Sequence, residues 1–277
     1  MRSQTEKAAA FQALHRRPGA FIIPNPWDAG TARLLASLGF EALATTSLGL
    51  ANTLGRPAVS RDEILANCRA IAAATDLPVN VDLENCGADA PRTAAETIRL
   101  AAEAGAVGGS IEDFSGDRAR PIYEFGLAVE RVQAAAAVAR GLPVPFMLTA
   151  RAEGLLYPDG DLDDVIRRLQ AFEAAGADVL YAPGLRDLDA IRRVVSAVAK
   201  PVNVVMTHAD PTLTLADLAA AGVKRISVGG SVSRFALGAF LGAAREMKER
   251  GAFTFVREAA PAKALWAAFE RGAGGAG

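Results

Sequence analysis

The chain has 277 residues, of which 51% are hydrophobic and 22% are charged, and its formal net charge is −1. This length allows a large buried core, and a near-zero charge without a basic cluster argues against nucleic acid as a partner. No apolar run reaches the roughly 18 residues of a membrane span, and the amino end lacks the apolar core of a signal peptide, so we expect a cytoplasmic protein.

Short apolar runs alternate with amphipathic helical patterns along the chain, after a polar amphipathic helix at the amino end. The runs expected to be strands are Phe21–Pro24, Ala42–Thr45, Val79–Asp82, Gly108–Ile111, Phe146–Ala150, Val179–Ala182, Val202–Met206 and Arg225–Val228. The helices expected between them are Gly30–Leu38, Arg61–Thr75, Arg92–Ala104, Leu127–Ala139, Leu162–Ala175, Leu188–Val198 and Leu215–Ala221. A last long helix is expected to begin near Arg234.

Local signals mark where several of these elements end. Gly39, Gly105, Gly176 and Gly222 each follow a helix that ends in Ala or Leu, and they fit the left-handed position that terminates a helix. The sequence Ser-Arg-Asp-Glu from Ser60 is a capping box that predicts a helix start.

Continuously apolar strands that alternate with helices indicate parallel pairing, with both faces of the sheet buried. Eight such units in one chain favour a (β/α)8 TIM barrel with an extra N-terminal helix. A doubly wound sheet is the alternative, but no G-x-G-x-x-G follows the first strand.

We expect residues 1–277 to form a single barrel domain, with an extended C-terminal helical arm from about residue 251 to residue 277. The arm carries Phe253, Phe255, Trp266 and Phe269 on an Ala-rich segment. It would pack either back on its own barrel or on a neighbouring subunit, because exposed apolar patches need cover.

Charged and polar residues cluster where the predicted strands end. All strand carboxyl ends of such a barrel face one rim, where active sites are found. The residues brought to this rim are Thr46, Ser47, Asp82, Glu84, Glu112, Asp113, Arg151, Glu153 and His208.

Asp82 and Glu84 are two residues apart, so on a strand they would share one face and point together beside Glu112. Adjacent carboxylates repel one another, and a proton or a cation must relieve that repulsion. Oxygen ligands suit Mg2+ or Mn2+ better than zinc. The alternative is an ion-pair network with Arg151.

Other rim residues suggest how a substrate would be held. Arg151 has the planar fork that matches a carboxylate, and the loop Thr46-Ser47-Leu48-Gly49 could hold an oxyanion. His208 could transfer a proton near neutral pH. Cys86 is more simply explained as packing.

Two further patterns limit the chemistry. No lysine ends a predicted strand, which argues against an imine mechanism. The segment Ser227–Ser231 has the composition of a backbone phosphate cradle after the eighth strand, which keeps a phosphate ester as a minority alternative.

From about Pro18 to about Arg250 the chain resembles the isocitrate lyase / phosphoenolpyruvate mutase superfamily. The resemblance lies in NPWDAGTARLLASLGFEAL, TTSLGLANTLG, VDLENCG, SIED, TARAEG and AAGADVLYAPG. It implies Mg2+ near Asp82, Glu84 and Glu112, held mostly through water. It also implies a small 2-oxo acid whose carboxylate meets Thr46, Ser47 and Leu48 and which contacts Arg151. The resemblance further implies a homo-oligomer, a dimer or tetramer that exchanges its C-terminal helices.

The chain departs from that pattern after the fourth strand. The lyases of the superfamily carry a Lys-(Lys/Arg)-Cys-Gly-His loop whose cysteine donates a proton, whereas DFSGDRARPIYEF here has neither Cys nor His. The Lys and Asn-Ser of the mutase loop are also missing. Isocitrate cleavage and phosphonate chemistry are therefore not expected.

We expect instead a Mg2+-dependent carbon–carbon lyase or decarboxylase that acts through an enolate on a 2-oxo acid of the pyruvate, oxaloacetate or 2-oxoglutarate type. Arg151, Glu112 and His208 are the expected catalytic residues, and Tyr123 or water could replace His208 as proton donor. The alternatives are a P–C or C–C hydrolase and a barrel that binds a 2-oxo dicarboxylate without turnover.

Overall fold

A computed structural model describes residues 1–274 of the chain, which are built around one parallel sheet. The strands are β1 (Phe21–Ile22), β2 (Leu43–Ala44), β3 (Val79–Asp82), β4 (Gly108–Glu112), β5 (Met147–Arg151), β6 (Val179–Tyr181), β7 (Val202–Val205) and β8 (Arg225–Ser227). They pair in the order β1-β8-β7-β6-β5-β4-β3-β2. A doubly wound sheet would reverse its order part-way, so this topology excludes that alternative.

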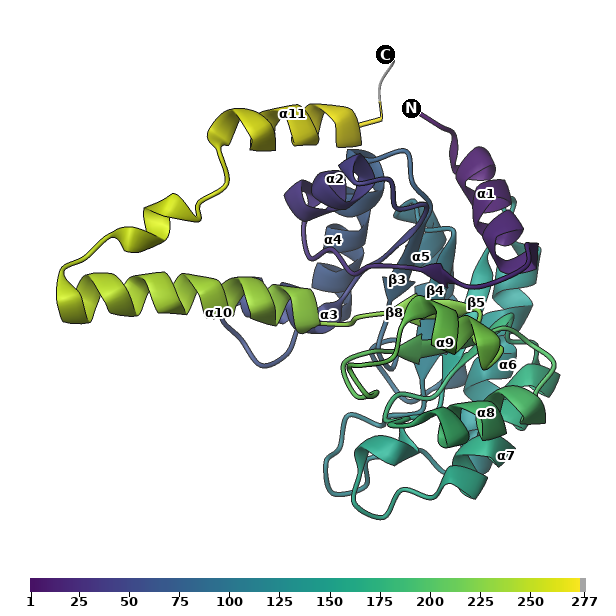
Figure 1. The fold of residues 1–277 in the computed structure, drawn as a ribbon. Coiled ribbons are helices and arrows are strands. Elements are labelled where there is room, and N and C mark those ends of the chain that lie inside the picture. The colour runs from purple at the N-terminus through teal and green to yellow at the C-terminus, as the bar shows by residue number, and fades with distance from the viewer. Residues whose placement is uncertain (275–277) are drawn as a thin grey trace.

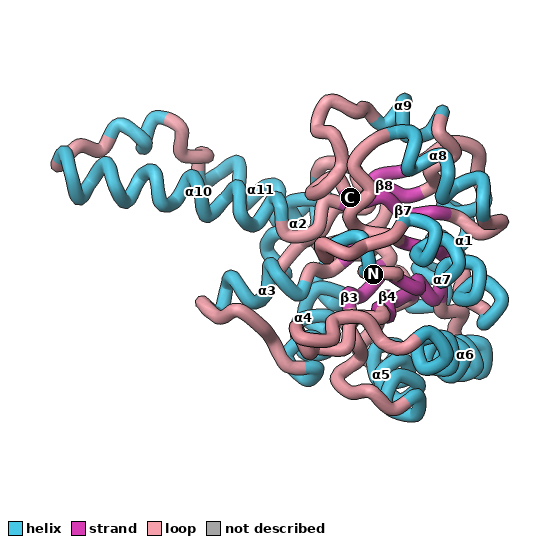
Figure 2. The backbone as a smooth tube through the Cα atoms, turned by 90° about the horizontal axis from the view of Figure 1, so that it is seen from below, coloured by secondary structure: helices cyan, strands magenta, loops and turns pink. Residues whose placement is uncertain are grey.

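The two end strands of the sheet meet and close it into a barrel. The Ala44 N–H donates to the Pro24 carbonyl at 3.0 Å, and the Asn25 side-chain amide donates to the Thr45 carbonyl at 3.2 Å. Figure 2 shows the strands at the centre of the main body with helices around them. The predicted (β/α)8 barrel is confirmed.

Helices cover the outside of the barrel in the expected alternation (Figure 1). They are α1 (Gln4–Arg16), α2 (Ala29–Ser37), α3 (Ser47–Leu54), α4 (Arg61–Ala74), α5 (Pro91–Glu103), α6 (Phe125–Gly141), α7 (Leu162–Ala175), α8 (Leu188–Ala197), α9 (Leu215–Ala220), α10 (Ser231–Arg245) and α11 (Ala262–Gly272), with short turns η1 (Gly154–Leu156), η2 (Glu246–Arg250) and η3 (Thr254–Arg257). The four predicted helix-ending glycines have φ between 85° and 108°. The capping box at Ser60 is also present.

The main difference from the sequence prediction is α3. The residues after Thr46, which are predicted to be a loop, form a helix whose N-cap is Thr46. The Thr46 hydroxyl accepts a hydrogen bond from the Gly49 N–H at 3.2 Å. As a consequence, the first turn of a helix, rather than an open loop, faces the mouth of the barrel.

Helix α1 closes the amino-terminal end of the barrel. Its Phe11 and Leu14 are buried in a cluster with Phe21 and Val107, which lie where β1 and β4 begin. The ammonium group of Lys7 fixes the helix by donating to the Ala72 and Thr75 carbonyls at 2.9 and 2.7 Å. The interior of the barrel therefore opens toward the carboxyl ends of the strands.

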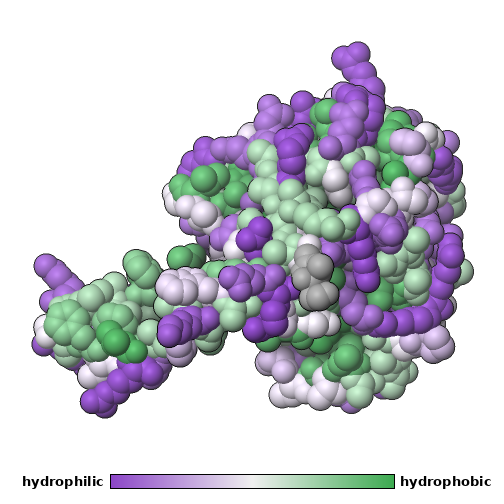
Figure 3. All heavy atoms as spheres, turned by 90° about the horizontal axis from the view of Figure 1, so that it is seen from above, coloured by the Kyte–Doolittle hydropathy of each residue, from purple (hydrophilic) through white to green (hydrophobic). Residues whose placement is uncertain are grey.

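An arm formed by α10 and the segment after it projects from the barrel (Figure 1). Apolar side chains lie along its surface (Figure 3), and Phe235 and Phe240 are 80% and 66% exposed. Helix α11 then returns to pack on α2. Within residues 1–274, no helix is long and apolar enough to cross a membrane.

Candidate active site

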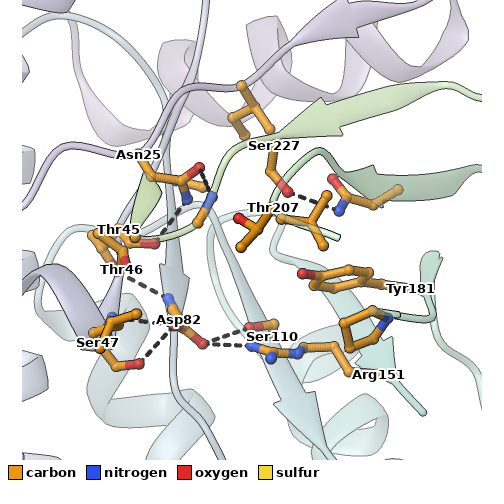
Figure 4. A pocket seen from close by; sticks show the side chains of 18 of the residues that line it. Asn25, Thr45, Thr46, Ser47, Asp82, Ser110, Arg151, Tyr181, Thr207 and Ser227 are labelled. Atoms are coloured by element: carbon orange, nitrogen blue, oxygen red, sulfur yellow. Dashed lines mark hydrogen bonds and ion pairs between the residues drawn. The ribbon is translucent and has the colours of Figure 1, made fainter. Parts of the chain in front are cut away.

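A cavity of about 190 Å³ opens at the rim where the strands end. Six of the predicted site residues line it, namely Thr46, Ser47, Leu48, Asp82, Arg151 and His208. Figure 4 shows the labelled side chains converging on this cavity from several strands. Glu84 and Glu112 are not among the lining residues.

Arg151, at the end of β5, is the centre of the charged cluster. Its guanidinium contacts Asp82 at 2.8 Å, Glu112 at 3.1 Å and Glu153 at 2.8 Å. Each of its three nitrogens takes one carboxylate, and only 15% of the side chain is exposed. The predicted ion-pair network is therefore present, and Arg151 lines the cavity while holding the acids in place.

Asp82 links four neighbouring strand ends. One carboxylate oxygen accepts from the Ser47 N–H and hydroxyl at 3.1 and 3.0 Å, and the other accepts from Ser110 at 3.4 Å as well as from Arg151 (Figure 4). The Asp82 N–H donates to the Thr45 hydroxyl at 2.9 Å. The start of α3 is thus fixed to the acidic cluster, and both side-chain and backbone donors of Ser47 are already used.

Glu84 does not lie on the same strand face as Asp82, so the predicted position of Glu84 is wrong. Strand β3 ends at Asp82, and Glu84 has a left-handed φ of 50°. Arg131 holds the turn that follows, because its guanidinium donates to the carbonyls of Asn85, Ala88 and Asp89. A constrained turn, rather than the strand period, brings Glu84 back beside Asp82.

The cluster carries more acid than base. Burial, and then the charge of Asp82, raises the pKa of Glu84. Burial also raises the pKa of Glu112 well above its ordinary value, an effect that Arg151 opposes. Although burial opposes it, Glu153, Glu112 and Asp82 raise the pKa of Arg151. One guanidinium therefore faces four carboxyl groups, and the raised pKa values of Glu84 and Glu112 show that a proton or a cation is needed to relieve the mutual repulsion.

The excess of acidic groups is compatible with a bound cation, but the geometry restricts how a metal ion could be coordinated. Within residues 1–274, no three His, Cys, Asp or Glu side chains are grouped so as to enclose a metal directly. A divalent ion at this cluster would consequently need water to complete its ligands, as hard ions commonly do. Asp82, Glu84 and Glu112 remain the predicted metal ligands.

The remaining predicted groups lie at the mouth. Leu48, in the first turn of α3, is 46% exposed and lines the cavity, and the first N–H groups of a helix have no partner within it. His208 is exposed at the mouth, where partial loss of water lowers the pKa of its imidazole. The roles of Thr46, Ser47, Leu48 and His208 toward a substrate stay predictions.

Two other expectations change with the structure, and one is confirmed. The suggested phosphate cradle is not free, because the Val228 and Gly229 N–H groups both donate to the Asn25 side-chain oxygen at 2.9 Å. The Tyr123 hydroxyl donates to Asp89 at 2.6 Å and lies outside the cavity lining. Cys86 is fully buried in the core, as the packing interpretation predicts, and burial raises the pKa of its thiol to about 12.

Sequence reasoning missed several residues that line the cavity. Tyr181 places its ring over the Arg151 guanidinium, 5.0 Å from ring centroid to carbon, and its hydroxyl points into the cavity (Figure 4). Asn80, Asn203 and Arg225 lie deeper in the barrel and line the same cavity. A polar residue inside an otherwise apolar strand, as in VNVD, VNVV and KRIS, was the available signal.

Comparison with known proteins agrees with this arrangement. A family model described as phosphoenolpyruvate phosphomutase matches residues 11–248. A crystal structure of a Burkholderia cenocepacia J2315 protein, provisionally called a lyase/mutase, is 59% identical with a TM-score of 0.94, and the match covers 96% of each chain.

Two relatives of named activity are more distant. Oxaloacetate decarboxylase of Chromohalobacter salexigens is 28% identical over 84% of this chain and 82% of its own. Phosphonopyruvate hydrolase in complex with oxalate and Mg2+ has a TM-score of 0.84 over 95% of this chain and 94% of its own, and at 23% identity this likeness concerns the fold. The chain belongs to the phosphoenolpyruvate phosphomutase family, within the isocitrate lyase / phosphoenolpyruvate mutase superfamily.

Proposed function

We propose that the protein is a Mg2+-dependent carbon–carbon lyase of the decarboxylase type that acts on a small 2-oxo acid. The observation that carries this proposal is the cluster of four carboxyl groups around Arg151, beside a small cavity at the barrel rim. With a divalent cation bound among these acids, the site would suit a reaction in which negative charge develops on an oxygen beside the cation and Arg151.

Mg2+ or Mn2+ would be held near Asp82, Glu84 and Glu112, largely through water. Raised pKa values of Glu84 and Glu112 support this assignment, because a cation would relieve the burial and repulsion of their charges. When bound, the ion supplies a Lewis acid for the keto oxygen. The superfamily includes a hydrolase that binds oxalate with Mg2+, which supports the same choice of ion.

The reaction itself breaks the bond between C3 and a carboxylate carbon at C4. The bonding electrons stay on C3 and delocalise onto the 2-oxo oxygen as an enolate, while carbon dioxide leaves. Arg151 is placed to stabilise that charge with the N–H groups that its three carboxylates leave free. The first turn of α3, at Leu48, would hold the substrate's C1 carboxylate.

A proton must then reach C3. His208 at the mouth is one candidate donor, and the Tyr181 hydroxyl that faces the cavity is another. The segment after β4 supplies neither a cysteine nor a histidine. We therefore expect isocitrate and 2-methylisocitrate to be cleaved about 10²–10⁴-fold more slowly than in lyases with a cysteine donor.

A turnover screen tests the proposal. Oxaloacetate should yield pyruvate in the presence of Mg2+ and not after chelation, and 2-hydroxy-tricarboxylates and phosphonates should yield no product. Thermal stabilisation by 2-oxo acids without any product would favour the non-catalytic binding barrel. Rapid isocitrate cleavage would contradict the argument from the segment after β4.

We also propose a homo-oligomer, a dimer or tetramer, held by the C-terminal helices. The exposed apolar side chains Phe235 and Phe240 of α10 and Trp266 of α11 support it, because a partner subunit would cover them. Light scattering at micromolar concentration should return at least a dimer mass, and a monomer mass would refute the proposal. The cytoplasmic location stays a prediction.

A further inference from the structure

The segment after β3 is a tight turn that carries one of the predicted metal ligands. Glu84 and Cys86 both have a left-handed backbone, with φ of 50° and 62°, although neither is glycine. Residues with side chains adopt this conformation at a cost, and they keep it only where the surrounding contacts enforce it. The contacts of residues 84–89 therefore decide where the Glu84 carboxyl group lies.

The first half of the turn is fixed to the neighbouring strand and to α5. The Glu84 carbonyl accepts from the Glu112 N–H at 3.1 Å, and the Cys86 N–H donates to the Leu83 carbonyl at 2.8 Å. The Thr97 hydroxyl donates to the Cys86 carbonyl at 2.9 Å. Two predicted ligands, Glu84 and Glu112, are thus joined through their backbones, and a change in the turn would move one carboxyl group relative to the other.

Arg131 of α6 fixes the second half of the turn. Its guanidinium donates to the carbonyls of Asn85, Ala88 and Asp89. The guanidinium also lies over the Tyr123 ring, 4.5 Å from the ring centroid, and the Tyr123 hydroxyl donates to the Asp89 carboxyl group at 2.6 Å. Three carbonyls of one turn therefore converge on a single cationic group from another helix.

Arg131 serves this turn rather than the cavity. Its side chain is only 1% exposed, and Nε has no hydrogen-bond partner among the residues that the structure describes. A buried guanidinium is costly unless hydrogen bonds compensate it, and here the carbonyls of the turn provide that compensation. Because Arg131 is not among the residues that line the cavity, it can influence the site only through the turn.

We infer that Arg131 is a positioning residue for the metal site, which holds the turn in the shape that keeps the Glu84 carboxyl group beside Asp82 and Glu112 and thereby sets the affinity for Mg2+. This inference rests on the proposed function and adds to it a residue that touches neither the metal nor the substrate. With Arg131 in place, the ligand is oriented before the ion arrives. Without it, binding of the ion would also have to order the turn, and the affinity would fall.

Calorimetric titration of Mg2+ into two variants tests the inference. Arg131→Met removes all three hydrogen bonds and should weaken Mg2+ binding about tenfold or more, the scale on which groups that orient metal ligands contribute. Arg131→Lys keeps the charge but lacks the planar fork that serves several carbonyls at once. Its Mg2+ affinity should lie between those of the wild type and Arg131→Met.

A double-mutant cycle with Glu84→Gln shows whether Arg131 acts through Glu84. If it does, the protein that carries both Glu84→Gln and Arg131→Met should bind Mg2+ as weakly as Glu84→Gln alone, because the carboxylate that Arg131 positions is already lost. Fully additive losses would mean that Arg131 acts independently of Glu84, and they would overturn the inference.

Lys7→Met is the matched control, because Lys7 is also a buried cation that holds backbone carbonyls. Lys7 is 5% exposed and donates to the Ala72 and Thr75 carbonyls near the amino-terminal end of the barrel, away from the rim. Its loss should lower the free energy of unfolding and leave the Mg2+ affinity unchanged. Arg192→Met removes an arginine of α8 that is 57% exposed, and it should change neither quantity.

Each result decides something. Unchanged Mg2+ affinity in Arg131→Met would overturn the inference, as would an equal loss of affinity in Lys7→Met, which would make the effect of Arg131 a general loss of structure. If Arg131→Met fails to fold, Arg131→Lys decides, and wild-type affinity in that variant would overturn the inference. In these cases Mg2+ binding by the wild type leaves the proposed function standing, whereas no Mg2+ binding by the wild type would overturn both.

Discussion

Arg151 and Arg225 are buried in one cavity with opposite surroundings. Arg151 contacts three carboxylates at the rim, while Arg225 contacts an amide oxygen and a hydroxyl at the floor. The rim therefore has more acidic than basic groups, and the floor has a cation without an acidic partner. Whether each charged group has a partner within the chain therefore decides the electrostatic character of a site more than the number of charges does.

Removing Arg151 should have the largest effect on stability and on turnover. Arg151→Met leaves buried carboxylates without their counter-charge, so we expect a loss of about 3–5 kcal/mol in the free energy of unfolding. Metal-dependent turnover should disappear as well. Urea denaturation of the metal-free protein measures the first effect, with Arg192→Met as the surface control, expected within about 0.5 kcal/mol. A loss below about 1 kcal/mol would show that Arg151 is not the partner of these acids.

Arg151→Lys is the matched conservative change. It keeps the charge but loses the planar fork that serves several carboxylates at once. Binding of 2-oxo acids should weaken markedly by calorimetry, and undiminished binding would contradict the assigned role of Arg151.

Neutralising the acids of the rim should have the next largest effect. Asp82→Asn and Glu84→Gln should each weaken Mg2+ binding by about tenfold or more, since groups that hold a metal directly or through water contribute on this scale. Calorimetric titration of Mg2+ measures it, and Asp189→Asn, in an exposed α8 position, serves as control. Unchanged affinity in both variants would exclude the metal site.

Arg168 has fewer acidic partners than Arg151 and more than Arg225. It contacts the buried Asp113 at 3.4 Å and the half-exposed Asp164 at 2.8 Å. Burial raises the pKa of Asp113 from 3.8 to about 7. The folded state then binds a proton that the unfolded state has lost. Without metal, the free energy of unfolding should therefore fall as pH rises from about 4 to about 7, by up to about 1.4 kcal/mol per pH unit.

Asp113→Asn should flatten that dependence in urea denaturation at several pH values. Asp164→Asn is the control with the opposite sign. Although burial opposes it, hydrogen bonds from Arg168 lower the pKa of Asp164, so its contribution is present above its ordinary pKa and is lost as pH falls. An unaltered pH profile in Asp113→Asn would assign the slope to other acids of the cluster.

The smallest effect is expected at the floor. Arg225→Met loses two hydrogen bonds but also removes a buried cation that no carboxylate balances. These contributions oppose each other, so the free energy of unfolding should change by no more than about 1 kcal/mol. A loss as large as that of Arg151→Met would mean that Arg225 has an internal counter-charge and would remove the contrast between the two arginines.

The barrel and the rim follow from simple features of the sequence, because apolar strands, helix-ending glycines and charged strand ends are local signals. Arg151 with Asp82 and Glu112 could be brought together by topology alone. Glu84 could not be placed correctly, since its turn depends on Arg131 from a distant helix. Arg225 could not be predicted for another reason: only the whole barrel interior shows that its hydrogen-bond partners are neutral and that, within residues 1–274, Nη1 has none.

The closure between β1 and β2 has a consequence for motion. Within residues 1–274 one backbone hydrogen bond, from Ala44 of β2 to Pro24 just after β1, joins the two segments, whereas β4 and β5 pair along five residues. Local opening should therefore begin at this junction. The Ala44 amide should exchange with deuterated solvent sooner than that of Gly109 in β4. Asn25 and Thr45, on either side of the junction, also line the cavity. A bound substrate that bridges them would therefore slow this exchange and stabilise the closed barrel.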